Sequence, residues 1–174
     1  MSDHVLTERL QPSLLDRLTD SDPTNLKETR ESRVIDLRRL REIIQRDLGW
    51  LLNTFDNSSL IDPVLYPNVA NSVLAYGVQE VAGEYSTVER TMKIRASIQR
   101  AIEKFEPRII PGSLDVILRD DKDAAETVVT FDIAADMWAQ PLPMELYLRS
   151  SVDVTTGELK LERPGPGAAA VRKR

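Results

Sequence analysis

The chain is organised around the stretch STVERTMKIRASIQRAIEKFEPR (residues 86–108), which is followed by IIPGSLDVIL (residues 109–118). Ser86 and Glu89 have the spacing of a capping box, which predicts that a helix starts there. Pro107 ends this helix, because proline has no backbone N–H and disfavours helical geometry in the residue before it. Apolar side chains recur between these points at helical steps and form one stripe: Ile94, Ile98, Ile102 and Phe105. The alternation of Leu114, Val116 and Leu118 then predicts a strand.

Glu106, Pro107 and Arg108 form the hinge between this helix and this strand. A rigid turn there holds a carboxylate and a guanidinium in fixed positions, which suits either bracing of the turn or binding of a partner. A glycosidase needs two carboxylates across its sugar, and nothing in the sequence identifies a second one. Arg108 also favours the ionised form of a nearby carboxyl group, whereas a general acid must carry a proton. We therefore predict a bracing or partner-binding site and no catalytic residue.

Residues 34–55 form the clearest long helix of the sequence. Ser32 is a candidate N-cap, and Asp36 favours the first turn. Its apolar stripe repeats at three- and four-residue steps: Leu37, Leu40, Ile44, Leu48, Leu51 and Phe55. The opposite face carries alternating charges and is predicted to face solvent: Arg38, Arg39, Arg41, Glu42, Arg46 and Asp47. Trp50 lies off the stripe, so it is either part of a broad buried face or an anchor for another subunit.

The remaining elements predict an α+β fold, with helices packed on one face of a small, mostly antiparallel β-sheet. Tyr66 and Pro67 open a short helix whose inner residues are expected to be Val69, Val73 and Tyr76, and Gly77 suits a left-handed position. From residue 112 the apolar period is two, which predicts four strands. They pass through residues 114–118, 129–133, 145–154 and 159–161, with a loop over residues 134–143.

The sequence divides into an arm (residues 1–33), a domain (residues 34–162) and a disordered Pro-Gly and basic tail (residues 163–174). The arm contains an apolar patch of Leu10, Leu14, Leu15 and Leu18. This patch is either a short helix docked on its own domain or a peptide that binds a partner through its leucines. The fourth strand is short, so the sheet edge near Val152, Val154 and Leu159 is expected to be poorly covered and to accept a strand from another chain.

The composition of the chain disfavours several classes of function and of binding site. The 174 residues carry a net charge of −5, which disfavours a general nucleic-acid or anionic-membrane binder. The absence of cysteine excludes thiol chemistry and fits a reducing compartment, and His4 is the only histidine, so a zinc site is not expected. The N-terminus shows no secretory signal, and no apolar run is long enough to span a bilayer. We expect a soluble cytoplasmic protein without a cofactor or a metal.

Several short motifs are each a weak signal of a protein family, but their order and spacing together are specific. They are LQPSLLDRL (residues 10–18), ESR (31–33), RDLGWLLN (46–53), YP (66–67), SVLAYG (72–77) and FEPR (105–108). Together they resemble the phage baseplate wedge family with a Glu-Pro-Arg signature, often labelled lysozyme-like, and more narrowly its branch in the bacterial type VI secretion baseplate. The resemblance extends over roughly residues 10–161, and the Pro-Gly tail departs from it.

The resemblance implies a non-enzymatic subunit that joins wedge proteins to a contractile sheath and helps to start sheath polymerisation. The implied partners are the wedge proteins TssF, TssG and TssK and the sheath proteins TssB and TssC, at a baseplate docked on the inner membrane. The alternative is a peptidoglycan-cleaving, lysozyme-like enzyme. A regulatory adaptor of similar fold fits the leucine-rich arm less well.

Overall fold

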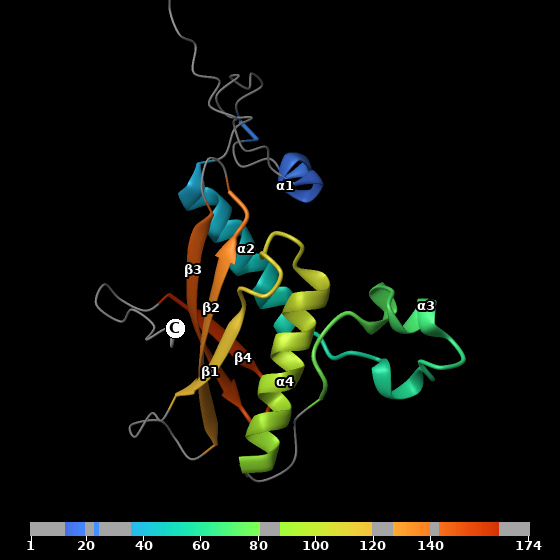
Figure 1. The fold of residues 1–174 in the computed structure, drawn as a ribbon. Helices are drawn as coiled ribbons and strands as arrows, with labels where there is room; N and C mark the ends of the chain where they lie inside the picture. The colour runs from blue at the N-terminus through green and yellow to red at the C-terminus, as the bar shows by residue number, and fades with distance from the viewer. Residues whose placement is uncertain are drawn as a thin grey trace, which may run out of the picture.

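The computed structural model of the chain describes residues 13–19, 23–24, 36–80, 88–119, 127–139 and 143–163 (Figure 1). The helices are α1 (Leu14–Leu18), α2 (Leu37–Leu52), α3 (Pro67–Ala70) and α4 (Val88–Phe105), and the 3-10 turns η1 (Ser58–Leu60) and η2 (Val73–Ala75) flank α3. The strands are β1 (Asp115–Arg119), β2 (Val128–Met137), β3 (Met144–Asp153) and β4 (Leu159–Glu162). The predicted cap at Ser86, most of the arm and the tail after Arg163 lie outside the described residues.

The four strands form one antiparallel sheet in the order β1-β2-β3-β4. The register places Ile133 opposite both Val116 and Leu148, so that the inward residues of neighbouring strands lie side by side. Helices α2 and α4 lie on one face of this sheet (Figure 1). The predicted α+β architecture is therefore confirmed.

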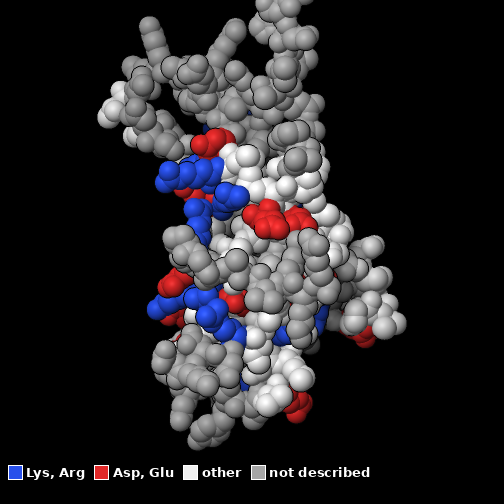
Figure 2. Space-filling view, turned by 60° about the vertical axis from the view of Figure 1, so that its left-hand side comes forward, with Lys and Arg blue, Asp and Glu red and all other residues white. Residues whose placement is uncertain are grey.

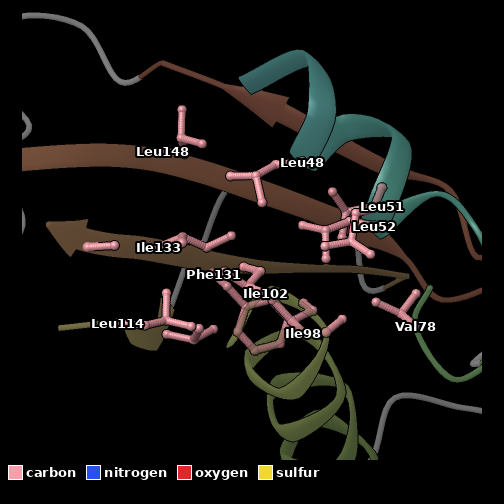
Figure 3. Close-up of a cluster of buried hydrophobic side chains, with 14 of the residues drawn as sticks. Leu48, Leu51, Leu52, Val78, Ile98, Ile102, Leu114, Phe131, Ile133 and Leu148 are labelled. Atoms are coloured by element: carbon pink, nitrogen blue, oxygen red, sulfur yellow. The ribbon is translucent and has the colours of Figure 1, made fainter. Parts of the chain in front are cut away.

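The core lies between these two helices and the sheet. Figure 3 shows Leu48, Leu51 and Leu52 on α2 and Ile98 and Ile102 on α4 directed toward side chains of the sheet. All of these residues are buried, together with Phe131, Ile133 and Leu148 of the sheet. Burying one such side chain contributes about 1.5–3 kcal/mol, so the helical stripe and the strand alternation stabilise the fold jointly.

Helix α2 is shorter at both ends than predicted. Its N-cap is Asp36, whose carboxylate accepts a hydrogen bond from the backbone N–H of Arg39 at 2.7 Å. The helix ends at Leu52, and Phe55 lies beyond it, about half-exposed and in a parallel bridge with Val78. The predicted inward position of Phe55 is therefore wrong.

Strand β2 is longer than predicted, and the expected loop from Ala134 is wrong at its start. Residues 134–137 continue the ladder with residues 144–147 of β3. A second set of partners comes from the chain after the hinge, because Ile110 donates from its N–H to the carbonyl of Asp136 at 2.8 Å and Ile109 bridges Met137. These long-range partners are invisible in a local reading of the sequence.

The short central helix α3 begins at Pro67 as predicted, and Gly77 has a φ of +126°. Val73, however, is exposed rather than inward. The reason is that α3 makes a single turn and a separate turn, η2, begins at Val73, so the helical period does not carry over.

Side chains of the helices close parts of both sheet edges. On β4, the Asn53 amide bonds the backbone of Leu159, and Gln45 Nε2 donates to the carbonyl of Leu161 at 3.3 Å. On β1, Arg95 Nε donates to the carbonyl of Val116 at 2.5 Å. The expectation of a poorly covered edge is therefore wrong at Leu159. Strand β4 pairs with β3 only from Arg149 to Val152, so it does not reach the first half of β3.

Charges of both signs alternate on the side of the molecule shown in Figure 2. On the sheet, Asp132 of β2 pairs with Arg119 at 3.3 Å and with Arg149 at 3.2 Å. This side therefore presents no extended basic surface among the described residues. No helix in the described ranges is long and apolar enough to cross a bilayer.

Candidate functional site

The hinge residues predicted from the sequence form a close ion pair. The Arg108 guanidinium donates to both carboxylate oxygens of Glu106, from Nε at 2.6 Å and from Nη2 at 2.5 Å. The backbone N–H of Arg108 donates to the same carboxylate at 3.1 Å. Glu106 is 4% exposed, whereas 28% of the Arg108 side chain is accessible. The carboxylate is thus a buried brace, and the arginine carries the accessible part of the pair.

The backbone holds this pair between α4 and the sheet. Glu106 still belongs to the last helical turn, because its N–H donates to the carbonyl of Ile102 at 2.9 Å. Two residues later the chain joins the end of β2, where the N–H of Trp138 donates to the carbonyl of Arg108 at 2.8 Å. Pro107 between them prevents the helix from continuing. The turn therefore fixes both side chains relative to two separate elements.

A chain of ion pairs extends from the hinge to α2 and α1. Arg108 Nη2 also contacts the Asp47 carboxylate at 2.7 Å, and the other oxygen of Asp47 accepts from Arg46 Nη2 at 2.7 Å. Arg46 Nη1 in turn donates to Asp16 of α1 at 2.6 Å. We call these five residues the charge network: Asp16, Arg46, Asp47, Glu106 and Arg108. It joins three parts of the chain by alternating charges.

The electrostatics of the network favour its ionised form. Burial lowers the pKa of Arg108, but hydrogen bonds and charges from Glu106 and Asp47 outweigh it and raise that pKa well above the ordinary value. At Asp16 burial raises the pKa, and hydrogen bonds from Ser13 and Arg46 reverse the effect and lower it. Alternating charges in a partly buried place thus stabilise one another, as expected for charge-assisted hydrogen bonds.

Aromatic side chains surround the network. Trp50 is half-exposed, with the Arg46 guanidinium 4.8 Å from its ring, and Trp138, also half-exposed, is hydrogen-bonded through its backbone to Arg108. Tyr76 packs edge-on against Phe105 at 5.2 Å. Burial, Asp47 and Glu106 raise the Tyr76 pKa, which keeps its hydroxyl protonated. The surface at the hinge therefore combines arginine with tryptophan, the residue types enriched where protein partners bind most strongly.

The other predicted site residues lie in two different settings. Leu14, Leu15 and Leu18 are exposed, because α1 is bound to the domain through Asp16 and not through its leucines. The charge network thus brings α1 to the hinge. Val152, Val154 and Leu159, by contrast, have buried side chains in the core. Only their backbone could take part in strand addition.

The site residues that sequence reasoning missed are Asp16, Arg46, Asp47 and Trp138. The charges of α2 were predicted to face solvent, and nothing local pairs Asp47 with Arg108, 61 positions later. A usable signal did exist, because RDLGWLLN (residues 46–53) and FEPR (residues 105–108) both belong to the resembling motif set. Trp138 was assigned to a loop, and in the structure it directly follows the last residue of β2, Met137.

Within the described ranges, no three acidic, histidine or cysteine side chains are grouped so that they could hold a metal ion. The carboxylates of Glu106 and Asp47 are instead both bound by one guanidinium. The site can therefore bind the surface of a partner protein through hydrogen bonds and aromatic contacts.

A family model described as baseplate wedge protein gp25 matches residues 38–142, more than half of the chain. The matched range includes α2, α4, the hinge, β1 and β2, and excludes α1, β3 and β4. Four of the five network residues fall inside it, and Asp16 falls outside. No curated protein and no solved structure matches the chain significantly.

Proposed function

Because the chain belongs to the baseplate wedge protein gp25 family, a family of structural baseplate proteins, we propose that it serves in a bacterial type VI secretion baseplate. In this role it is the counterpart of TssE: it joins the wedge proteins TssF, TssG and TssK to the contractile sheath. It works in the cytoplasm at a baseplate docked on the inner membrane. The family match over the hinge is the observation that carries this proposal.

The hinge surface supports a binding role. Arg108 uses Nε and Nη2 in its internal bonds, and its accessible part can donate to a carboxylate or a carbonyl of a wedge protein. Trp138, hydrogen-bonded to Arg108 through its backbone, and Trp50, beside Arg46, are half-exposed aromatic side chains. Arginine and tryptophan anchors of this kind contribute most of the binding free energy in many interfaces.

The same geometry disfavours the lysozyme-like alternative. Both oxygens of Glu106 accept hydrogen bonds from a guanidinium and are therefore not free to act on a glycosidic oxygen. Asp47 is joined to Glu106 through the same guanidinium rather than facing it across a space for a sugar. We infer that the protein does not cleave peptidoglycan.

Binding to the wedge is tested by co-purification of TssF, TssG and TssK with variants of the hinge. Arg108→Lys keeps the positive charge beside Glu106 but loses the planar fork, and Trp138→Ala removes the aromatic surface. Both are expected to reduce recovery of the wedge proteins, while Arg119→Lys, in the exposed pair with Asp132, leaves it unchanged. Full recovery with both hinge variants, shown to be folded by circular dichroism, would contradict the proposal. Release of soluble fragments from purified cell walls would instead favour the enzyme.

Contact with TssB and TssC is proposed to use strand addition at the edge of β3 and β4, where an incoming strand displaces the Asn53 amide from the backbone of Leu159. Proline at Val152 is a poor test, because β3 pairs on both sides at that residue. Leu159→Pro is sharper, since the N–H of Leu159 points to Asn53 and away from the ladder with β3. Asn53→Ala is its control: it removes the hydrogen bond from the Leu159 N–H, together with the one to the Leu159 carbonyl, but keeps the N–H itself. Blocked sheath assembly in cells with the proline alone is expected, at a temperature at which both variants are folded and soluble. Normal assembly with both variants would refute strand addition here.

A further inference from the structure

A projecting lobe, which we define as residues 57–75, has no role in the function proposed above. It contains η1, α3 and η2 and extends away from the rest of the domain beside α4 (Figure 1). Six large apolar side chains of the lobe are exposed, with Val64 at 85%: Leu60, Val64, Leu65, Tyr66, Val73 and Leu74. Apolar side chains grouped in this way on a soluble domain indicate an interaction surface.

The base of the lobe is closed by backbone hydrogen bonds. Val78 donates to the carbonyl of Thr54 at 2.8 Å, and Asp56 donates to the carbonyl of Val78 at 2.9 Å. Gly77 permits this approach, because a Cβ at that residue would lie 2.3 Å from the Thr54 oxygen. The two ends of the lobe are thus held together by the backbone.

Contacts further out hold the lobe against α4. Lys104 Nζ donates to the carbonyl of Ala70 at 2.5 Å. Within the lobe, the Asp62 carboxylate accepts from the N–H groups of Val64 and Leu65 at 2.8 and 3.2 Å. The exposed apolar side chains are therefore presented by an ordered backbone, which lowers the entropy cost of binding.

Charge decides which kind of surface covers the lobe. The lobe contains one acidic residue, Asp62, and no lysine, arginine or histidine, and Asp56 directly precedes it. An anionic bilayer repels such a segment, because membrane attraction depends on basic residues. Two lobes packed together would oppose their like charges. An apolar surface rimmed by lysine or arginine complements both the apolar side chains and the negative charge of the lobe.

We propose that the lobe is a second docking surface, separate from the hinge, for an apolar face of another protein that is edged by Lys or Arg. The inference rests on the proposed baseplate function for its choice of partner, a wedge protein. The lobe then contacts the partner through its leucine and valine side chains, and the carboxylates of Asp62 and of the adjoining Asp56 pair with the basic rim.

The test places a photo-crosslinking amino acid at Leu65 in the lobe or at Trp138 beside the hinge, in the full-length protein co-expressed with TssF and TssG. A crosslink from Leu65 to an apolar segment flanked by Lys or Arg, mapped by mass spectrometry, is the expected result. A crosslink from Trp138 without one from Leu65 would overturn the lobe inference and leave the proposed function intact. Failure at both positions would remove the function and the inference together.

Affinity measurements on the purified complex refine the result. Leu65→Ser is expected to weaken binding about tenfold, whereas Val88→Ser, which changes an equally exposed residue outside the lobe, has no effect. Asp62→Asn keeps the oxygen that caps the turn but removes the charge, and should weaken binding by about threefold at low salt. This loss should vanish near 1 M salt, where the screening length is about 3 Å.

Two outcomes would replace the proposed occupant. Binding of the protein to anionic phosphatidylglycerol vesicles that Leu65→Ser abolishes would assign the lobe to a membrane. A dimer in sedimentation that the same variant dissociates would assign it to a second copy. Either result overturns the inference of a basic-edged protein partner.

Discussion

The side-chain amide of Asn53 makes two hydrogen bonds with the backbone of Leu159. Its Oδ1 accepts from the Leu159 N–H at 2.9 Å, and its Nδ2 donates to the Leu159 carbonyl at 2.8 Å. The amide thus occupies the place that a residue of a fifth strand would take. An otherwise open edge is blocked there by one side chain at the end of α2.

Removal of this amide should destabilise the protein. Asn53→Ala leaves two buried backbone groups of Leu159 without their partner, and each group can cost about 1–3 kcal/mol. We expect a lower melting temperature, by roughly 2–4 °C for each kcal/mol lost. Thermal melts followed by circular dichroism measure the effect, with Asn68→Ala, an exposed asparagine of α3, as the control. Equal melting of the two variants would show that the Asn53 bonds add nothing to stability.

The same variant should aggregate more readily than the native protein, because an unblocked edge offers hydrogen-bonding groups to other chains. Light scattering at equal concentration, below the melting temperature of both proteins, tests this expectation. Unchanged scattering by folded Asn53→Ala protein would show that the edge is protected by other means.

The hinge pair should matter for stability as well as for binding. Arg108→Ala leaves the Glu106 carboxylate buried and unpaired, which can cost about 3–5 kcal/mol. Arg119→Ala breaks a more exposed pair and should cost no more than about 1 kcal/mol. Urea unfolding curves compare the two variants. Similar midpoints for both would show that the Glu106 site is hydrated or relaxed when Arg108 is absent.

The contrast between the hinge and the network shows what the sequence could predict. Glu106 and Arg108 are two positions apart, so local sequence was enough to predict that they lie close together. It was also enough to predict that α4 ends before Pro107. Asp47 reaches Arg108 only because α2 packs beside the hinge, and a periodic pattern that places residues on one face does not identify contacts across the fold. The α+β class followed from periodicity alone, whereas the end of β2 is set by its ladder with β3 and by the bridge between Ile109 and Met137.

The docking of α1 should depend on pH. The pKa of Asp16 is lowered, since hydrogen bonds from Ser13 and Arg46 outweigh the opposing effect of burial. A lowered folded-state pKa means that the contact stabilises the native state above the ordinary value of 3.8, and is lost as the pH falls through the folded-state value below it. Carboxyl chemical shifts in NMR titrations measure this value directly.

Arg46→Gln is the matching variant for that titration. It should move the Asp16 pKa back toward 3.8 and leave the lowered pKa of Asp153 unchanged, because the latter is set first by the backbone N–H of Thr155. If the pKa of Asp16 is the same in Arg46→Gln as in the native protein, α1 is not held by this ion pair in solution.

Three glycines in different surroundings test whether the close backbone contact at Gly77 holds the base of the lobe. Gly77→Ala places a Cβ 2.3 Å from the Thr54 carbonyl oxygen at a φ of +126°. The backbone must therefore shift, which breaks the hydrogen bonds of Val78 with Thr54 and Asp56. Gly112→Ala, at a φ of +78° with nothing within 4 Å, carries only the conformational cost of about 1–2 kcal/mol. Gly49→Ala lies inside α2 with open space around its Cβ and should stabilise the protein by up to about 1 kcal/mol. Melting temperatures should therefore rank Gly49→Ala above native, then Gly112→Ala, then Gly77→Ala. If Gly77→Ala melts no lower than Gly112→Ala, the contact between Gly77 and Thr54 does not hold the base of the lobe.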